Sequence, residues 1–267
     1  MPDSVAPPSP ARRQTLRTLA HHGAIAATRV LPGSTALWGI PFAPHATATT
    51  SGTAAWPPPS MALEYVIDGQ RSGMAIRASG GLRWQCNAHR YRAELSMVAL
   101  VIFRRTQVSS GAIDMGHLEP SRFEDHQRRI QHAEFDAALG RVRYGSGAER
   151  DWPAGGQDRV SLLLSLGPLV QAAMARGETR ISLPVSDAKN WQLWTYALSS
   201  TETVSPPAGP IPAIRLQRTD AHRREQDTEI WLAPSLHMLP VRLRIQEANG
   251  DVADQRLKAR TPLPALA

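Results

Sequence analysis

The densest group of polar residues that could do chemistry is Gln157-Asp158-Arg159-x-Ser161, at the start of an apolar segment. Asp and Ser are two members of a hydrolase triad, and a distant His would supply the third. However, the Gly-x-Ser-x-Gly nucleophile elbow is absent, and Ser161 falls in the first turn of an expected helix. A carboxylate at a helix start accepts free backbone N–H groups. We therefore interpret Asp158 as a helix cap or part of a buried polar network, with ligand contact and catalysis as alternatives.

Histidine and cysteine spacing offers no ready-made metal site. Cys86 and His89 supply two ligands at most, whereas a structural zinc site needs four and a catalytic site three. Four histidines in the body of the chain lack the His-x-x-x-His and His-x-His spacings that bring two ligands together: His117, His126, His132 and His237. Because Cys86 is the single cysteine, the chain forms no intramolecular disulfide. We expect neither a metal nor another cofactor.

Tryptophan is in excess, with seven Trp against four Phe and four Tyr. Trp191 and Trp194 are three residues apart, so on a regular strand they face opposite sides of a sheet. One of them is then in the core, and the other is exposed or lines a groove. Trp231 stands just before Leu232-Ala233-Pro234, where the proline ends a strand, so its ring could sit at a sheet rim. Core packing is the simpler interpretation of these rings, and stacking on a sugar or a lipid head group is the alternative.

The net charge of +7 does not indicate nucleic-acid binding. The basic residues are arginines except for Lys189 and Lys258, and the arginines are scattered among acidic residues instead of forming one stripe. We therefore expect a solvated surface of mixed charge and no nucleic-acid partner.

Residues 1–60 differ from the rest of the chain. The basic pair Arg12-Arg13 precedes a weakly apolar segment from Leu19 to Ile40 and an Ala46-Thr47-Ala48 site, which is the order of a secretory signal, and the pair itself resembles a twin-arginine signal. The apolar segment is too interrupted to span a membrane, which takes about 20 consecutive apolar residues. We expect export, with a plain disordered or mis-started N-terminus as the alternative. In both cases residues 1–60, which end in a Pro-rich linker, are expected to be disordered and to lie outside the fold.

From Met61 onward apolar and polar residues mostly alternate, which is typical of strands with one buried face. The pattern starts at 63–67 and recurs at 74–77, 82–85, 91–101, 106–113, 121–126, 131–137, 141–144, 180–185, 191–198, 213–218, 228–232, 241–247 and 252–258. Leu139-Gly140 and Asn249-Gly250-Asp251 predict hairpin turns. So many short strands with close turns favour an antiparallel sheet or an open barrel over parallel βαβ units.

One segment, Gln157 to Gly177, has the spacing of a helix. Asp158 is the candidate N-cap, Gly177 is the stop, and Pro168 is expected to kink the helix or to split it into two. Apolar residues cover more than one side of it: Val160, Leu162, Leu163, Leu164, Leu166, Gly167, Leu169, Val170 and Met174. The surplus indicates either a second layer of packing or an apolar cavity between helix and sheet.

The chain resembles family 3108 of the domains of unknown function, which occurs in exported proteins of Gram-negative bacteria. The resemblance covers about 200 positions, from Leu63-Glu64-Tyr65 to Gly250. Its pieces include Gly73, Ser110-Gly111, Leu118-Glu119-Pro120-Ser121-Arg122-Phe123, Phe135, Gln157-Asp158-Arg159-Val160-Ser161, Trp231-Leu232-Ala233-Pro234 and Leu239-Pro240-Val241-Arg242. It implies a location in the cell envelope and a β-rich fold, and it brings no activity, substrate or catalytic residue.

The sequence thus predicts a mainly β single domain over residues 61–260, followed by a disordered tail at 261–267. About eleven to thirteen antiparallel strands would form a strongly curved sheet or open barrel, with one kinked apolar helix packed on it.

The favoured hypothesis for function is a non-enzymatic, periplasmic binding or scaffold domain for an apolar or lipid-like ligand, a glycan or a protein partner. The alternative is a hydrolase or lyase with dispersed catalytic residues around Asp158 and Ser161. No catalytic residue is assigned, no transmembrane span is expected, and the oligomeric state stays open. The candidate ligand-binding residues are Arg122, Gln157, Asp158, Arg159, Ser161 and Trp231.

Overall fold

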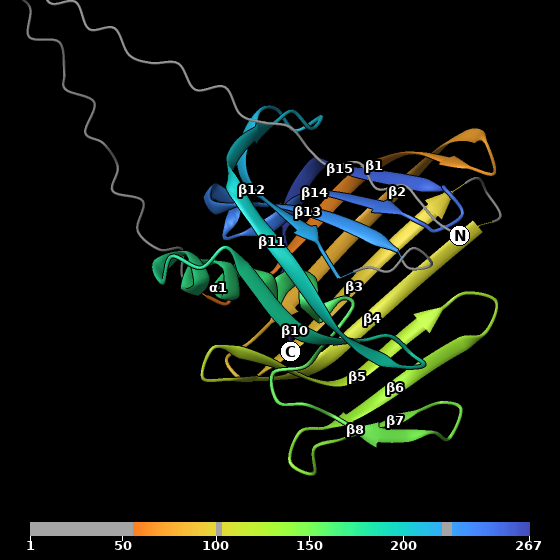
Figure 1. Cartoon of the computed structure of the whole chain (residues 1–267), viewed down its shortest axis with the longest axis vertical. Coiled ribbons are helices and arrows are strands. Elements are labelled where there is room, and N and C mark those ends of the chain that lie inside the picture. Colours follow the sequence, from red (N-terminus) through yellow and green to blue (C-terminus); the bar gives the residue numbers. More distant parts are fainter. Residues whose placement is uncertain (1–55, 100–102, 221–225) are drawn as a thin grey trace, which may run out of the picture. The chain divides into compact units, whose positions relative to one another are not determined.

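Pairing between strands that follow each other along the chain builds one large sheet. The computed structural model describes residues 56–99, 103–220 and 226–267. Within these ranges fifteen strands form a single curved sheet that does not close, in the order β8-β7-β6-β5-β4-β3-β2-β1-β15-β14-β13-β12-β11-β10-β9 (Figure 1). Their bounds are β1 (Met61–Arg71), β2 (Met74–Cys86), β3 (Arg90–Ala99), β4 (Phe103–Asp114), β5 (His117–His126), β6 (Ile130–Asp136), β7 (Arg141–Tyr144), β8 (Glu149–Asp151), β9 (Gln157–Asp158), β10 (Arg180–Ser186), β11 (Trp191–Val204), β12 (Ile211–Arg218), β13 (Asp227–Ala233), β14 (Leu239–Gln246) and β15 (Val252–Pro262).

Alternation of side chains gives the sheet one buried face. In β1, Leu63, Tyr65 and Ile67 are buried, and the residues between them are more exposed. Both predicted hairpins are present: Gly140 joins β6 to β7 and Gly250 joins β14 to β15, each with the positive φ that glycine adopts without strain. The predicted fold class, a mainly β domain with a curved and open sheet, is confirmed.

The number of strands exceeds the predicted eleven to thirteen. β8 and β9 have three and two residues, which is too short to show an alternating pattern. β9 also pairs in parallel with Val185 and Ser186 of β10, whereas the other strand pairs of the described ranges are antiparallel. The helix that connects β9 to β10 explains this exception, because a crossover through a helix returns the chain in the same direction.

The two ends of the described chain are packed on the sheet, in segments where the sequence predicted disorder. The N–H groups of Leu263 and Leu266 donate to the carbonyl oxygens of Ser60 (2.9 Å) and Cys86 (3.1 Å). Where a disordered tail was expected at 261–267, the backbone continues the pairing that β15 begins. Residues 56–60 are also placed, and the carbonyl of Pro58 accepts a hydrogen bond from the Trp84 indole (2.9 Å). The expected signal segment and its Ala46-Thr47-Ala48 site lie outside the described residues.

The helix predicted from Gln157 to Gly177 is α1 (Ser161–Ala175), a continuous helix that contains Pro168. Of the two effects predicted for Pro168, a kink or a split, the split is not found. The helix ends as predicted at Gly177, whose φ is +71°. The N–H groups of Gly177 and Glu178 donate to the carbonyl oxygens of Met174 (3.0 Å) and Ala173 (2.9 Å), which is the Schellman pattern. A short 3₁₀ helix, η1 (Pro234–Leu236), joins β13 to β14.

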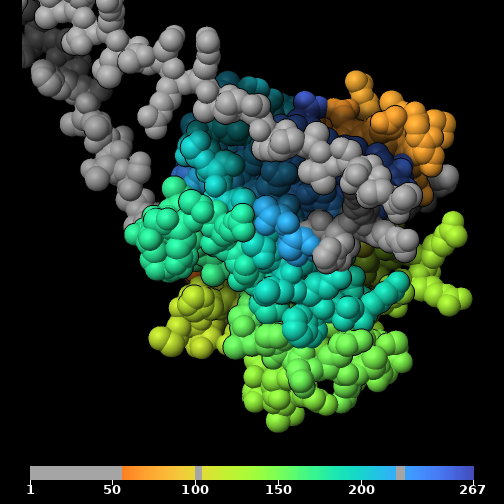
Figure 2. Space-filling model, in the orientation of Figure 1, coloured from red at the N-terminus to blue at the C-terminus, as the bar shows by residue number. Residues whose placement is uncertain are grey.

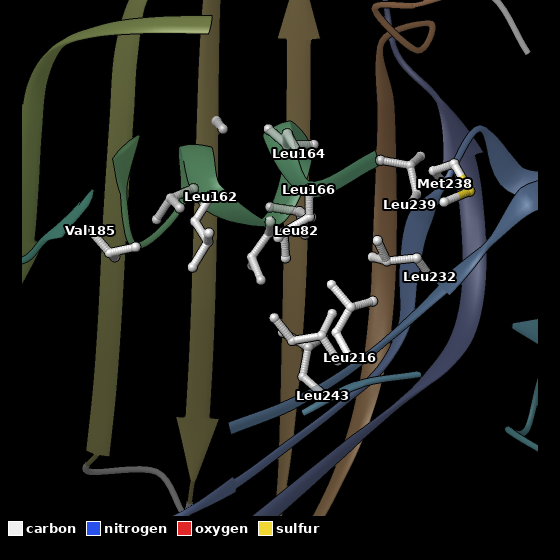
Figure 3. Packing of buried hydrophobic residues seen from close by; sticks show 14 of the residues in the cluster. Leu82, Leu162, Leu164, Leu166, Val185, Leu216, Leu232, Met238, Leu239 and Leu243 are labelled. Atoms are coloured by element: carbon white, nitrogen blue, oxygen red, sulfur yellow. The ribbon is translucent and has the colours of Figure 1, made fainter. Parts of the chain in front are cut away.

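The first two turns of α1 are buried on every side. α1 contacts β5, β9, β10 and β14, and Figure 3 shows Leu162, Leu164 and Leu166 among the apolar side chains of the sheet. A second layer of packing therefore uses most of the surplus apolar surface. Met174, which the spacing predicted to face the core, is instead 51% exposed, because the last turn of α1 is largely uncovered. No helix within the described residues has the length and apolarity to cross a membrane.

Candidate ligand-binding pocket

A pocket of about 690 Å³ opens where three turns of the sheet meet one side of α1. The turns are those between β4 and β5, between β6 and β7, and between β8 and β9, and the first of them protrudes beside α1 in Figure 2. This volume lies in the range of small-molecule sites, about 300–1,000 Å³. Its apolar side chains include Trp56, Met115, Leu118, Leu139, Trp152, Pro168 and Leu169, and its polar ones are Asp114, His117, Glu119, Gln157 and Ser165.

The β4–β5 turn forms one rim of the pocket. Met115 and Gly116 both have positive φ (+44° and +81°), as in a type I′ hairpin turn. The Trp56 ring lies against this turn, since a Cβ at Gly116 would be 3.7 Å from its Cδ1 atom. The Trp56 indole N–H is buried and has no hydrogen-bond partner among the described residues.

The β8–β9 loop forms a rigid wall of the pocket. The Trp152 ring packs on Phe135 with 4.5 Å between the ring centres, and its backbone N–H donates to the carbonyl of Gly140 (2.8 Å). A Cβ at Gly156 would come within 2.5 Å of the Trp152 ring. Glycine is therefore required where the loop crosses the ring, and the indole stays in place at the pocket wall.

Gln157 joins the pocket wall to α1 and is buried. Its amide nitrogen donates to the carbonyl of Leu118 (2.9 Å), and its amide oxygen accepts from the Ser165 hydroxyl (2.9 Å). These bonds tie β9 to β5 on one side and to the helix on the other. Of the six candidate residues predicted from the sequence, Gln157 is the one that lines this pocket.

Asp158 and Ser161 lie beside Gln157 and are fully buried. The Asp158 carboxylate accepts hydrogen bonds from the backbone N–H groups of Val160 (2.8 Å) and Ser161 (2.9 Å) and from the Ser109 hydroxyl (2.5 Å). The Ser109 hydroxyl in turn shares a hydrogen bond of 2.9 Å with the Tyr91 hydroxyl. Val160 occupies the N-cap position, so the predicted cap is two residues early, but the carboxylate accepts the helix N–H groups as expected.

Burial dominates the electrostatics of this network. Removal from water raises the pKa of Asp158 to about 6, although its hydrogen bonds to Ser109, Ser161 and Val160 oppose the shift. Burial likewise raises the pKa of Tyr91, and the nearby Asp158 charge adds to that rise. Neither Asp158 nor Ser161 lines the pocket, and the hydrogen bonds of both are made inside the fold. The network holds the start of α1 against β4 and is fully buried.

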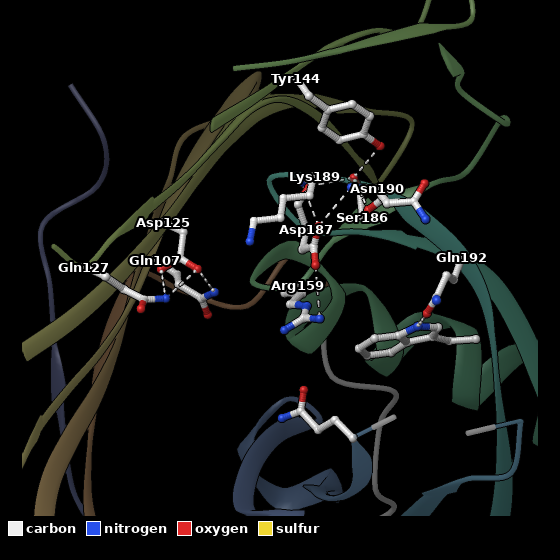
Figure 4. A network of polar contacts seen from close by, with 12 residues as sticks. Gln107, Asp125, Gln127, Tyr144, Arg159, Ser186, Asp187, Lys189, Asn190 and Gln192 are labelled. Carbon is white, nitrogen blue, oxygen red and sulfur yellow. Dashed lines mark hydrogen bonds and ion pairs between the residues drawn. The ribbon is translucent and has the colours of Figure 1, made fainter. Parts of the chain in front are cut away.

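Arg159 points away from this network into a smaller hollow of about 280 Å³. Its guanidinium pairs with the Asp187 carboxylate at 3.3 Å (Figure 4). The guanidinium groups of Arg159 and Arg218 lie 5.7 and 4.2 Å from the centre of the Trp194 ring. Trp194 is buried, and Trp191 is half-buried and packs against the hydrophobic core.

Arg122 and Trp231 lie elsewhere on the sheet. Arg122 sits on the opposite face of β5 from the buried Phe123 and pairs with Glu124 (2.7 Å) and Glu134 (2.6 Å). Trp231 is 4% exposed; its indole N–H donates to Glu202. The guanidinium groups of Arg215 and Arg242 lie 5.7 and 4.5 Å from the Trp231 ring centre. The structure therefore does not bring the six candidate residues into one site.

Most residues of the pocket were missed by the sequence reasoning. Trp56, Met115, Leu139 and Trp152 stand in turns or in the Pro-rich segment, where no periodicity marks them. One signal was present: Met115 and Leu139 are large apolar residues directly before a turn glycine, where polar residues are usual.

Comparison with known proteins identifies the family of this chain. A family described as "Protein of unknown function (DUF3108)" matches residues 72–258. The chain belongs to this family. The resemblance that the residues suggested is thereby confirmed, and no curated protein matches the sequence.

A solved structure with a similar fold is a beta-barrel-like protein of family DUF1849 from Brucella abortus, at 9% identity, a TM-score of 0.53, and coverage of 78% of this chain and 99% of that one. The MucA/MucB complex of Pseudomonas aeruginosa matches at 15% identity over 78% of this chain and 53% of that one, with a TM-score of 0.31. At 9% identity the likeness to the DUF1849 protein concerns the fold alone.

Proposed function

We propose that this DUF3108 domain binds an apolar, lipid-like ligand and catalyses no reaction. The observation that carries the proposal is the pocket of about 690 Å³, walled by Trp56, Trp152 and Leu169 and bordered by three turns. Sites for small ligands combine such apolar walls with a few polar groups that fix orientation. The Asp158–Ser161 pair, on which the hydrolase alternative depends, is buried outside this pocket.

The charges at the pocket favour a ligand with a neutral polar end. Asp114 and Glu119 line the pocket and are exposed, so their carboxylates would repel a free fatty acid. An ester or amide end carries no charge for these carboxylates to repel. We therefore infer that an acyl ester or amide binds more tightly than the fatty acid of the same chain length.

Leu169→Trp is expected to weaken binding of a fluorescent monoacylglycerol by about tenfold or more. Leu169 is a half-buried residue of α1 at the pocket wall, so a larger ring takes up the volume that the acyl chain needs. A fluorescence titration measures the effect, and the melting temperature should stay close to that of the parent protein, because the ring enters open space.

The matched control is Met174→Trp, which places the same ring on the same helix at an exposed position outside the pocket. This variant should bind like the parent protein. Equal binding by the parent and Leu169→Trp would contradict the proposed site, and a stronger response to a glycan or a peptide than to the acyl ester would assign it another ligand.

We also propose that the domain works in the periplasm. The support is the signal-like order of residues 1–60, together with the envelope location that the family resemblance implies. N-terminal sequencing of the protein extracted from cell envelopes should find the first residue well after the basic pair Arg12-Arg13. A first residue within the first ten positions would refute export by a cleaved signal.

A further inference from the structure

Two of the most exposed apolar side chains of the described residues stand at the rim of the pocket. Met115 in the β4–β5 turn is 91% exposed, and Leu139 in the β6–β7 turn is 75% exposed. Both line the pocket, although they come from separate turns. An apolar pair of this kind at the mouth of an apolar pocket is typical of a surface that meets another apolar phase.

The fold itself does not require a methionine at Met115. The β1–β2 turn has nearly the same backbone, with φ of +49° at Ser72 and +80° at Gly73, and it uses a small polar residue at the equivalent position. A side chain larger than Gly, Asn or Asp is disfavoured at such a φ. Met115 therefore accepts backbone strain while its side chain gains no cover from the protein, which points to a role outside the fold.

The acidic residues around the pocket rim favour a lipid surface without net charge over an anionic one. Asp114 and Glu119, both exposed, flank the Met115 turn and line the same pocket. They would be repelled by an anionic surface, whereas a zwitterionic lipid surface carries no net charge to oppose them.

We propose that Met115 and Leu139 insert into the surface of a zwitterionic lipid bilayer, with the pocket mouth facing the membrane. This inference rests on the proposed function, because a mouth held at the bilayer lets an acyl ligand pass between membrane and pocket without crossing water. Partial insertion of apolar side chains at the head-group boundary is how peripheral proteins hold such surfaces.

An environment-sensitive NBD label on a single cysteine tests the insertion directly in the full chain. Cys86→Ser removes the one native thiol, and Met115→Cys, Leu139→Cys or Met74→Cys then places the label. Met74 is the matched control, because it is also an exposed methionine beside a hairpin turn (68% exposed) and does not line the pocket. With phosphatidylcholine vesicles, labels at 115 and 139 should shift to the blue and brighten about twofold or more, and the label at 74 should not.

The outcomes separate this inference from the proposed function. If neither rim label responds, or if the label at 74 responds equally, the membrane inference is overturned. A response that requires phosphatidylglycerol and disappears in high salt also overturns it, because binding would then depend on charge. Adding Leu169→Trp should leave the rim response intact while monoacylglycerol binding falls. The two proposals can also fail separately. If the rim labels do not respond to vesicles but the protein without Leu169→Trp still binds monoacylglycerol, the membrane inference is wrong and the proposed binding function stands.

Discussion

Gly111→Ala should destabilise the protein by at least about 3 kcal/mol. Gly111 lies at a bulge where β4 pairs with β5, and a Cβ there would come within 2.0 Å of the Glu119 carbonyl oxygen and 2.8 Å of the Pro120 Cα. Both atoms belong to the backbone, so no side-chain movement relieves the overlap. Denaturant unfolding followed by tryptophan fluorescence measures the loss.

Gly81→Ala is the matched control, because Gly81 is also a strand glycine with negative φ. A Cβ at this position would meet the Leu63 carbonyl oxygen at 3.4 Å and the Ser96 hydroxyl at 3.6 Å, which are ordinary contacts. This variant should lose less than about 1 kcal/mol. Equal unfolding midpoints for the two variants would show that β4 and β5 do not approach as closely as the structure has them.

The stability of the parent protein relative to Asp158→Asn should fall by about 3 kcal/mol between pH 4 and pH 8. The pKa of Asp158 is about 6 in the folded protein and 3.8 as its ordinary value, so the folded state holds the proton more tightly. The stabilisation by that proton is complete below about pH 4 and is lost as the pH rises through 6. Asparagine does not titrate, and its amide oxygen still accepts from the N–H groups of Val160 and Ser161.

The measured quantity is the difference in unfolding free energy between the two proteins across this pH range. Other carboxylates, such as Asp125 and Glu229, have lowered pKa values and act in the opposite direction. They are present in both proteins, so they cancel in the difference. A difference that does not change with pH would mean that Asp158 is not a buried, desolvated carboxylate.

The sequence predicted those parts of the fold in which apolar residues recur at a regular spacing. Alternation in β1 and the glycine turns at Gly140 and Gly250 predicted an open antiparallel sheet, and the apolar spacing after Asp158 predicted α1 with its stop at Gly177. The short strands β8 and β9 were not predicted, because three and two residues are too few to show an alternating pattern.

The site was less predictable because it is built from turns. Gln157 and Asp158 were recognised as a polar group at a helix start, and the structure places them in a buried network beside the pocket. Trp56, Met115 and Trp152 become neighbours through the folding of separate loops, and a single sequence does not encode that proximity in its spacing. Trp231 was a candidate because tryptophan is in excess in the sequence. In the structure its ring and its indole N–H already contact Arg215, Arg242 and Glu202.

The most direct test of the central claim is photo-crosslinking with a monoacylglycerol that carries a diazirine in its acyl chain. Peptide mapping after irradiation should find the adducts in the three turns at 114–119, 137–140 and 152–156 and on α1 near Leu169. The same adducts should fall at least severalfold in Leu169→Trp and persist in Met174→Trp. Adducts spread over the outer face of the sheet, or unchanged in Leu169→Trp, would contradict a ligand-binding pocket at this end of the domain.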